Sequence, residues 1–329
     1  MLNRTTLLLG LAGLMLATGL VAYNGLGEVM QALSVAGWGI VWASLFHVVP
    51  MAFNARAWQV LLPGRRGPGL GFFLWLVWVR ESVNGLLPVA RVGGELVSAR
   101  LMLRQGIRAA PAAASLVVDM TLCMGSQFLF TIGGVALLAA GDDTPTTMRL
   151  LYGLLAGVPL IAAFWAVQRA GLFHLFHMVV KAMFGDRWVG LAGTLRRYDH
   201  AVRVMYRRSD RTLACLLWQL VGWAAGAGEI WLALLALGHP VSIGDALLIE
   251  ALIQALSSAA FLVPGALGVQ EGGFLAIGAL VGLPAEIGLA LALARRARDL
   301  LVFGPALLAW QVIEGRGLVI QKQDGRSPE

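Results

Sequence analysis

The chain has 329 residues, of which 58% are hydrophobic and only 13% are charged, and its formal net charge is +7. A soluble globular domain is about 45–50% apolar and about 25% charged. The composition therefore excludes a soluble protein that covers its core with polar side chains, and it favours a chain whose surface faces lipid.

Apolar stretches recur along the chain, and six are long enough to cross a bilayer, which takes about 20 mostly apolar residues in a helix. No segment alternates polar and apolar residues as the strands of a membrane barrel do. Arg4 precedes the first stretch as in a signal peptide, but that stretch is long enough to span and no clear A-x-A cleavage site follows it, so we interpret it as the first helix. The predicted spanning helices are 5–23, 39–62, 111–140, 149–168, 212–237 and 286–313.

The distribution of Lys and Arg predicts the orientation, because cytoplasmic loops are enriched in them. Basic residues fall at 65–66, at 100–108, throughout 169–211 and in the tail 314–329, whereas the loop with Asp142 is acidic. We therefore expect both termini in the cytoplasm and the Asp142 loop outside.

Two further apolar stretches are broken by Pro and Gly, and each begins and ends on one side of the predicted membrane. The stretch 70–108 is basic at both ends, so both ends are cytoplasmic. The stretch 246–283 follows a helix that leads out and precedes one that leads in, so it opens outside. We predict that each is a re-entrant hairpin, which enters the bilayer and returns to the same side.

Both halves of the chain then follow one plan in opposite orientation: helix, helix, re-entrant hairpin, helix. The first repeat covers 1–140; the second begins at 141–168, is interrupted by the basic segment 169–211 and continues over 212–313. The hairpins contain LPVARVGGE at 87–95 and VPGALGVQE at 263–271, and in each a Pro precedes a Glu by seven residues. Coincidence is the alternative, because Pro and Gly are common in such chains. The predicted fold class is an all-α polytopic membrane protein with an inverted repeat, typical of secondary transporters with a midplane site.

The broken hairpins hold most of the candidate site residues. Pro and Gly interrupt a helix, and non-helical backbone at membrane depth is tolerated only inside protein or beside water. Glu95 and Glu271 at the tips are expected to be paired or functional, since a charge near the bilayer centre costs about 2.5–3.5 kcal/mol. Arg295 and Asp299 have the spacing of a helical ion pair, and the face 219–229 is small and polar, which also suits close packing. The candidate transport residues are Arg80, Glu81, Asn84, Pro88, Arg91, Gly93, Gly94, Glu95, Asp119, Glu250, Gln254, Pro264, Gly265, Gly268, Glu271, Arg295, Arg298 and Asp299.

The basic segment 169–211 alternates apolar and basic residues, which predicts amphipathic helices on the cytoplasmic membrane surface. Lipid phosphate is the expected anion, and nucleic acid is not expected. His174 and His177 have no third ligand nearby, and Cys123 and Cys215 lie in apolar helices, so no metal, disulfide or cofactor is expected. The predicted lipid-surface residues are Arg196, Arg197, Arg203, Arg207 and Arg208.

Motifs of soluble enzymes were also sought. The sequence has no P-loop, no GxSxG and no HExxH, and its one long polar segment has about forty residues. No catalytic residue is therefore expected.

Two motifs, WVRESVNGLLPVARVGGE at 78–95 and VPGALGVQE at 263–271, carry a resemblance to a known family. The chain resembles the transmembrane, lipid-flipping region of lysylphosphatidylglycerol synthases, and within that group the membrane proteins of hopanoid-biosynthesis loci. The second motif is close to the family's P-G-G-x-G-x-x-E, with Ala266 where Gly is frequent, a departure expected to matter little. No segment resembles the lysyl-transfer domain, so the resemblance implies lipid movement rather than synthesis.

The expected function is therefore a lipid transporter or flippase of a bacterial inner membrane, with a hopanoid or a polar-headed phospholipid as cargo. Arg80, Arg91 and Arg298 would meet phosphate or hydroxyl groups, while Glu95, Glu271 and Asp119 would balance these charges or take a proton. Coupled and passive movement both remain open. The alternatives are a membrane enzyme that modifies lipid head groups, and a scaffold that organises lipid-synthesis enzymes through the basic segment.

Overall fold

The computed structural model describes residues 26–62, 68–87, 93–141, 189–260, 263 and 266–323. Over these ranges all regular structure is helical and no strand occurs, so the all-α class is confirmed for the described part of the chain. Several predicted features lie outside the described residues: helices 5–23 and 149–168, His174, His177, Pro88, Arg91, Pro264 and Gly265.

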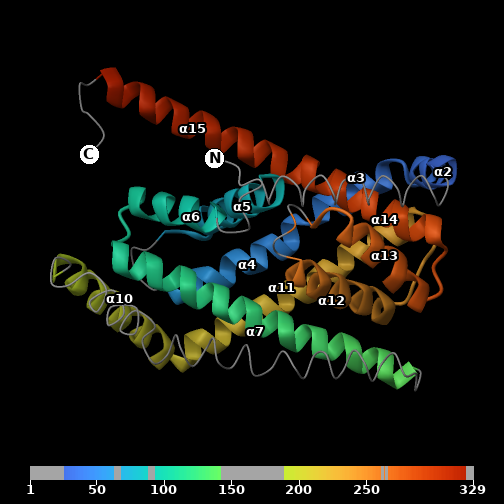
Figure 1. The fold of residues 1–329 in the computed structure, drawn as a ribbon, viewed down its shortest axis with the longest axis horizontal. Helices are drawn as coiled ribbons and strands as arrows, with labels where there is room; N and C mark the ends of the chain where they lie inside the picture. The colour runs from blue at the N-terminus through green and yellow to red at the C-terminus, as the bar shows by residue number, and fades with distance from the viewer. Residues whose placement is uncertain are drawn as a thin grey trace.

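Figure 1 shows the described helices in chain order, and residues 142–188 between α7 and α10 are outside the described part. The helices of the first half are α2 (Leu26–Ala36), α3 (Trp38–Phe46), α4 (Val48–Leu61), α5 (Leu70–Leu86), α6 (Gly93–Arg104) and α7 (Ala109–Gly141). Those of the second half are α10 (Val189–Arg207), α11 (Ser209–Ala236), α12 (Ile243–Ala259), α13 (Val269–Leu280), α14 (Ala285–Arg298), the π-helical turn η3 (Asp299–Phe303) and α15 (Gly304–Gln323).

Three segments are long and apolar enough to cross a membrane: Trp38–Leu61, Ala109–Leu137 and Ser209–Ala236. They confirm three predicted helices to within a few residues. Between 28% and 39% of their most apolar residues are buried inside the protein, so most of each helix faces outward. This is how a helix that contacts lipid differs from one in a soluble core.

The predicted helix 286–313 needs a correction. The chain is helical there, but the π turn η3 separates α14 from α15. Four charged residues lie at 295–299, immediately before or at this turn, and the segment is not among the three apolar spans. The apolar pattern used for the prediction cannot detect a π turn, because the turn changes the backbone bonding and not the composition.

Two pairs of short helices, which we call the α5–α6 pair and the α12–α13 pair, lie toward opposite ends of the molecule (Figure 1). The members of each pair pack against each other, and between the pairs α4, α7 and α11 run alongside one another. Each pair also contacts the other half of the chain, because α5 packs against η3 and α15 while α12 packs against α7.

Small residues permit the close approach of α11 to its neighbours. A Cβ at Gly222 would lie 2.8 Å from Oδ1 of Asn54 on α4, and a Cβ at Gly226 would lie 3.0 Å from Oε1 of Glu250 on α12. The small-residue face of 219–229 is therefore a packing surface for two helices, as such faces are in membrane proteins.

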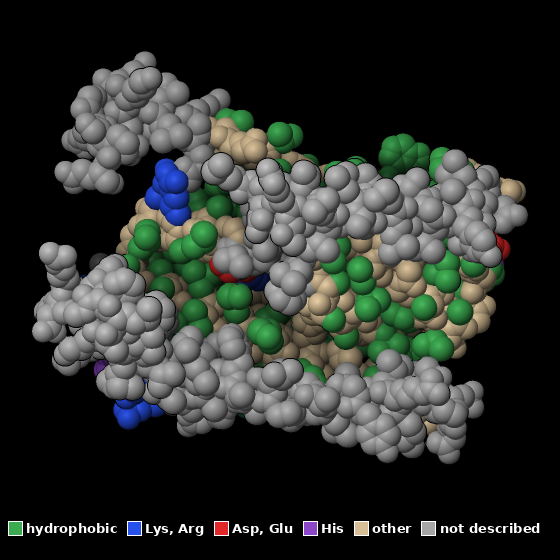
Figure 2. Space-filling model, viewed as in Figure 1, with side chains coloured by type: hydrophobic (Ala, Val, Ile, Leu, Met, Phe, Trp, Pro, Cys, Tyr) green, Lys and Arg blue, Asp and Glu red, His purple; other side chains and the backbone are tan. Residues whose placement is uncertain are grey.

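The described part of the surface carries many apolar side chains, and its exposed arginines gather at one end. Figure 2 shows hydrophobic side chains over much of this face, and Lys and Arg side chains near the ends of α6 and α10. Exposed residues of this basic end are Arg100, Arg104, Arg108, Arg203, Arg207 and Arg208. An apolar surface with a basic end suits a membrane protein whose basic end is cytoplasmic.

Candidate functional site

Charged side chains are buried between the helices, and those of the described residues are paired with opposite charges. Buried charges are tolerated only when they are paired and hydrogen-bonded. The most deeply buried are between 1% and 7% exposed: Arg80, Asp119, Glu229, Glu250, Glu271, Arg295 and Arg298. These residues lie in three of the four polar groups described below, and the remaining group surrounds the partly buried Glu95.

The first group joins α5, α7 and α11. Nη1 of Arg80 donates to Oδ2 of Asp119 at 2.8 Å, and Nε2 of Gln219 donates to Oδ1 of the same carboxylate at 3.0 Å. The Arg80 guanidinium also lies 4.9 Å from the ring centroid of Trp58, a cation–π distance. Glu81, whose side chain is 40% exposed, lies 3.6 Å from Nε of Arg80. The sequence analysis proposed Arg80 and Asp119 separately, and the structure brings them together.

The second group fixes the start of α6 on α5. The Asn84 side chain accepts from the Gly94 N–H at 2.8 Å and donates to the Glu95 carboxylate at 3.1 Å. Glu95 lies in the first turn of α6, where a carboxylate interacts favourably with the helix dipole. A Cβ at Gly94 would lie 2.5 Å from the Arg80 carbonyl oxygen, so only glycine allows this approach. Gly93 is the first residue of α6.

The third group joins α12 to α14 and fixes the start of α13. Arg295 donates to Glu250 through Nη1 at 2.6 Å and Nη2 at 3.1 Å, and Gln254 donates to the same carboxylate at 2.7 Å. Glu271, in the first turn of α13, accepts from the Gly268 N–H at 2.7 Å and from Nε of Arg296 at 2.9 Å.

The Glu271 turn contains one backbone feature that changes an expectation. Ala266 has φ 48°, in the left-handed region that favours glycine. An L-residue in this conformation costs about 1–2 kcal/mol. The Ala266 departure from the P-G-G-x-G-x-x-E pattern therefore does matter energetically, and the family's glycine fits this backbone without strain.

The fourth group lies where α3 meets α4, against α11 and the start of η3. Nδ1 of His47 lies 2.7 Å from Oε2 of Glu229 and 2.9 Å from Nη1 of Arg298. Arg298 also donates to Glu229 at 3.2 Å and through Nε to Asp299 at 2.9 Å. Asp299 therefore pairs with Arg298, and the partner of Arg295 is Glu250. The spacing along one helix suggested an ion pair between Arg295 and Asp299. It gave no information about Glu250, which lies on the neighbouring helix α12.

Besides the Gln219–Asp119 bond and the contacts of His47, two further contacts link the halves directly. Nε2 of Gln127 on α7 donates to the carbonyl of Gln254 on α12 at 2.9 Å and to the Ser258 hydroxyl at 2.7 Å. Nε1 of Trp78 on α5 donates to the carbonyl of Val302 in η3 at 2.6 Å. Each bond joins the first helix of a short-helix pair to the long helical segment of the other half.

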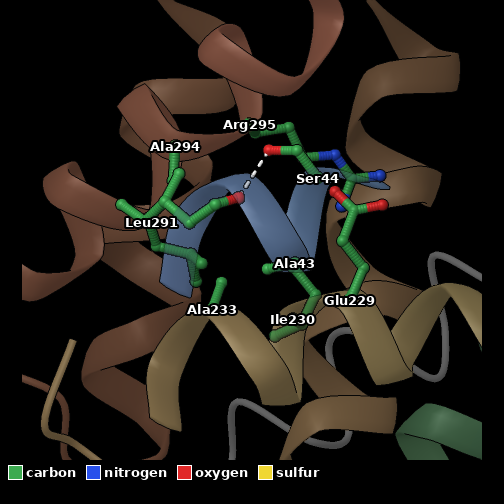
Figure 3. A pocket seen from close by; sticks show the side chains of 9 residues that line it. Ala43, Ser44, Glu229, Ile230, Ala233, Leu291, Ala294 and Arg295 are labelled. Carbon is green, nitrogen blue, oxygen red and sulfur yellow. Dashed lines mark hydrogen bonds between the residues drawn. The ribbon is translucent and has the colours of Figure 1, made fainter. Parts of the chain in front are cut away.

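A small cavity lies between α3, α11 and α14 (Figure 3). The space open to the centre of a water molecule is about 10 Å³, which is room for about one water. A lipid head group does not fit in this cavity. The cavity is lined by Ile40, Ala43, Ser44, Glu229, Ile230, Ala233, Leu291, Ala294 and Arg295.

The helix α10 presents opposite faces to the protein and to solvent. Tyr198, Val202 and Met205 are buried in the same apolar cluster as residues of α7, and burial raises the pKa of the Tyr198 hydroxyl above its usual range. Arg203 and Arg207 are exposed, as is Arg197. The predicted amphipathic helix is therefore present over Val189–Arg207, with Arg208 exposed just beyond it; the side chain of Arg196 is outside the described residues.

Three titratable residues of these groups were not among the sequence-predicted site residues, namely His47, Glu229 and Arg296, and the amide of Gln219 was not among them either. His47 and Glu229 are polar residues inside predicted spanning helices, and that position was a usable signal. Arg296 gave no comparable signal, because its role depends on the position of α13.

Comparisons with known proteins identify the family. The sequence matches the model of the lysylphosphatidylglycerol synthase TM region over residues 8–306, which is most of the chain. Comparison with curated proteins and with solved structures found no match. With its long apolar helices and its buried ion pairs, the chain is a multi-pass integral membrane protein that belongs to the lysylphosphatidylglycerol synthase TM-region family.

Proposed function

We propose that this protein moves a lipid across a bacterial inner membrane, along a polar path formed where two re-entrant hairpins meet near the midplane. The family is linked to lipid modification or transport. The observation that carries the proposal is the pair of broken helices, α5–α6 and α12–α13, whose breaks are each followed by a carboxylate in the first turn of the next helix.

Helix lengths support the re-entrant geometry. The α5 and α12 helices each have 17 residues, and α6 and α13 each have 12. A helix rises 1.5 Å per residue, so 12 residues reach about 18 Å, whereas the hydrocarbon core is about 30 Å thick. A 12-residue helix that starts near the midplane reaches one surface and does not cross, which suits a hairpin that returns to its own side.

The positions of matching residues support an inverted repeat. A shift of 176 residues superposes Pro88 on Pro264, Glu95 on Glu271 and Asp119 on Arg295. Asp119 on α7 pairs with Arg80 on α5, and Arg295 on α14 pairs with Glu250 on α12. The same shift in residue number aligns Trp78 with Gln254, and it aligns Val302 with the residue before Gln127. Trp78 bonds to Val302 and Gln127 bonds to Gln254, and both bonds link the two halves. Related contacts at related positions are expected of two repeats that pack around a pseudo-twofold axis.

The ion pairs suggest how the path opens. Arg80 and Arg298 are saturated by carboxylates here, so a phosphate or hydroxyl group must replace Asp119 or Glu229 in order to bind. Exchange of one anionic partner for another keeps each guanidinium paired while the head group passes. The apolar body of the lipid stays in the bilayer during this exchange. A hopanoid or a polar-headed phospholipid is the proposed cargo, and both termini are proposed to be cytoplasmic.

Lipid movement in liposomes tests the proposal. Labelled phospholipid and hopanoid probes are followed across liposomes that contain the purified protein, with and without a pH gradient. We expect Glu95→Gln and Glu271→Gln to slow movement by roughly tenfold or more, because each removes a charge-assisted hydrogen bond worth about 1.5–3 kcal/mol. The matched control is Glu286→Gln, which changes a partly exposed carboxylate at the start of α14.

Wild-type rates in both tip variants would exclude the hairpin site. Chemically altered lipid in the same liposomes, detected by mass spectrometry, would favour the membrane-enzyme alternative. The scaffold alternative predicts that charge reversal at Arg196, Arg197, Arg207 and Arg208 abolishes function in cells while both tip variants remain active.

A further inference from the structure

Each helix around the small cavity between α3, α11 and α14 contributes one polar side chain to its wall (Figure 3). Ser44 belongs to α3, Glu229 to α11 and Arg295 to α14. These residues are buried, at 2%, 5% and 6% exposed. The cavity has room for about one water molecule. A cavity lined only by apolar groups stays dry, whereas a polar cavity of this size holds water when it offers hydrogen-bond partners.

Arg295 contributes a donor that the described protein groups leave unused. Its Nη1 and Nη2 both donate to the carboxylate of Glu250, at 2.6 Å and 3.1 Å. Its Nε is buried and has no hydrogen-bond partner among the described residues. A buried donor without a partner is unfavourable, and more so on a charged group. The guanidinium therefore requires one more acceptor at Nε.

Glu229 and Ser44 contribute acceptor positions. The contacts of Glu229 with His47 and Arg298 both use Oε2, so its Oε1 keeps both lone pairs. The Ser44 hydroxyl donates to the carbonyl of Ile40 at 2.7 Å and also keeps its lone pairs. The wall of the cavity thus combines one unused donor with two acceptors that have free capacity.

Arg295 and Glu229 do not form a direct ion pair, although their charges are opposite and both line the cavity (Figure 3). Arg295 pairs with Glu250 on α12. The carboxylate of Glu229 contacts His47 and Arg298 instead. A molecule that lies between Arg295 and Glu229 is therefore needed to connect them.

The charges of the wall determine which kind of molecule fits. A cation would lie beside the guanidinium of Arg295, and an anion would lie beside the carboxylate of Glu229. Either would bring like charges together at a buried site, which is strongly unfavourable. The occupant is therefore neutral, and it both accepts and donates hydrogen bonds, as water does.

We propose that this cavity is the binding site of one water molecule, which accepts a hydrogen bond from Nε of Arg295 and donates to Oε1 of Glu229 and Oγ of Ser44. Buried waters make about three hydrogen bonds to groups that lack other partners. This inference concerns the packing of the core and does not depend on the proposed lipid transport.

The water connects two of the polar groups described above. Arg298 contacts Glu229 directly at Oε2, at 3.2 Å, and Arg295 contacts Oε1 of the same carboxylate through the water. Both oxygens of a buried carboxylate are then hydrogen-bonded, as burial of a charge requires. Since Arg295 also pairs with Glu250, one polar network holds α3, α11, α12 and α14 together.

A high-resolution crystal structure of the protein tests the site directly. We expect one ordered solvent peak within about 3.2 Å of Nε of Arg295, Oε1 of Glu229 and Oγ of Ser44. A cavity without density, in a map that shows buried waters elsewhere, would overturn the proposal. A hydrogen bond from Nε of Arg295 to a protein oxygen would overturn it as well.

Removal of one acceptor tests the geometry. We expect Ser44→Ala to lower the unfolding temperature in detergent by about 2–4 °C more than its control, because the water loses a partner. The matched control is Ser82→Ala: Ser82 is also buried, and its hydroxyl likewise donates at 2.7 Å to the carbonyl four residues earlier. Ser82 does not line the cavity. Equal losses in the two variants would contradict the proposed role of Ser44.

Filling the cavity distinguishes a water site from a dry one. Ala43→Ser and Ala43→Cys each add one heavy atom to a buried residue that lines the cavity. The serine hydroxyl can take over the bonds of a displaced water, whereas the thiol is a weak donor and acceptor and leaves Arg295 and Glu229 unpaired. We expect the serine variant to keep the wild-type unfolding temperature and the cysteine variant to unfold about 2–8 °C lower.

The opposite order in this pair would refute the water site. A dry cavity is stabilised by apolar filling and destabilised by a buried hydroxyl, so the cysteine variant would then unfold at the higher temperature. Both measurements are made with reducing agent present, so that oxidation of the added thiol does not contribute.

Discussion

At the scale of single residues, Gly94 determines how closely α6 approaches α5. A Cβ there would lie 2.5 Å from the Arg80 carbonyl and 2.8 Å from the Asn84 side chain. Since a backbone carbonyl cannot move aside cheaply, Gly94→Ala should lower the free energy of unfolding by about 1–3 kcal/mol, the usual effect of overpacking. Thermal unfolding in detergent measures this change.

Gly133→Ala is the matched control for that substitution. Gly133 is also helical, but no atom lies within 4 Å of a Cβ added there. Alanine favours helix over glycine by up to about 1 kcal/mol, so this variant should be unchanged or slightly more stable. Equal loss in both variants would mean that the α5–α6 contact does not set stability.

The sequence did not show which buried charged residues form ion pairs with one another. Arg80, Asp119, Glu250 and Arg295 were all predicted as candidates, because charges in apolar helices are conspicuous. Their partners depend on which helices pack together, and the one pairing inferred along a single helix, Arg295 with Asp299, was wrong. The tip carboxylates were predicted with their motifs, but the Asn84 and Gly268 contacts that fix them appear only in the structure.

At the scale of helices, the π turn η3 determines which side of α15 faces the rest of the protein. A π turn contains one residue more than the α-helical turn it replaces, and such turns are frequent at functional sites. Deleting exposed Leu300 should restore α-helical bonding and rotate α15 by about 100° relative to α14. The Trp78 bond to the Val302 carbonyl should be lost. We expect a lower unfolding temperature and a changed Trp fluorescence spectrum.

The control for the deletion is Leu300→Ala. The Leu300 side chain is 66% exposed, so its truncation should alter stability little. Identical behaviour of the two variants would show that loss of the side chain, rather than removal of the extra residue, is responsible.

Helices were the most predictable level, for a physical reason. The three long spans were predicted to within a few residues because about 20 consecutive apolar residues are a strong signal. The turn η3 and the division of 39–62 into α3 and α4 were missed. Both are changes of backbone geometry inside a uniformly apolar stretch, and hydropathy carries no information about them.

At the scale of the whole molecule, the proposed topology predicts which loops share a side of the membrane. Single cysteines at Gly69, Gln105, Pro240 and Val281, in a background without Cys123 and Cys215, can be tested with an impermeant thiol reagent on intact cells and inverted vesicles. Gly69 and Gln105 should label from the cytoplasmic side, and Pro240 and Val281 from the other. Labelling of Gly69 and Gln105 from opposite sides would mean that α5–α6 crosses the membrane.

The orientation of the whole molecule was predicted from the basic residues and stays a prediction. Exposed arginines of the α6–α7 connection and of α10 lie at the same end in Figure 2. Packing between the halves was beyond reach of the sequence, because α5 with η3 and α12 with α7 are contacts between residues more than one hundred positions apart.

The opposite polarity of two buried ion pairs has a consequence for assembly. The helices of the α5–α6 and α12–α13 pairs have equal lengths, so shape alone would let either pair dock beside α7 or beside α14 while the chain inserts. Arg80 finds a carboxylate on α7, whereas Glu250 finds a guanidinium on α14. An exchanged arrangement would bury two guanidinium groups in one interface and two carboxylates in the other. We therefore expect the ion pairs to direct α5–α6 to α7 and α12–α13 to α14, because only this arrangement pairs opposite charges.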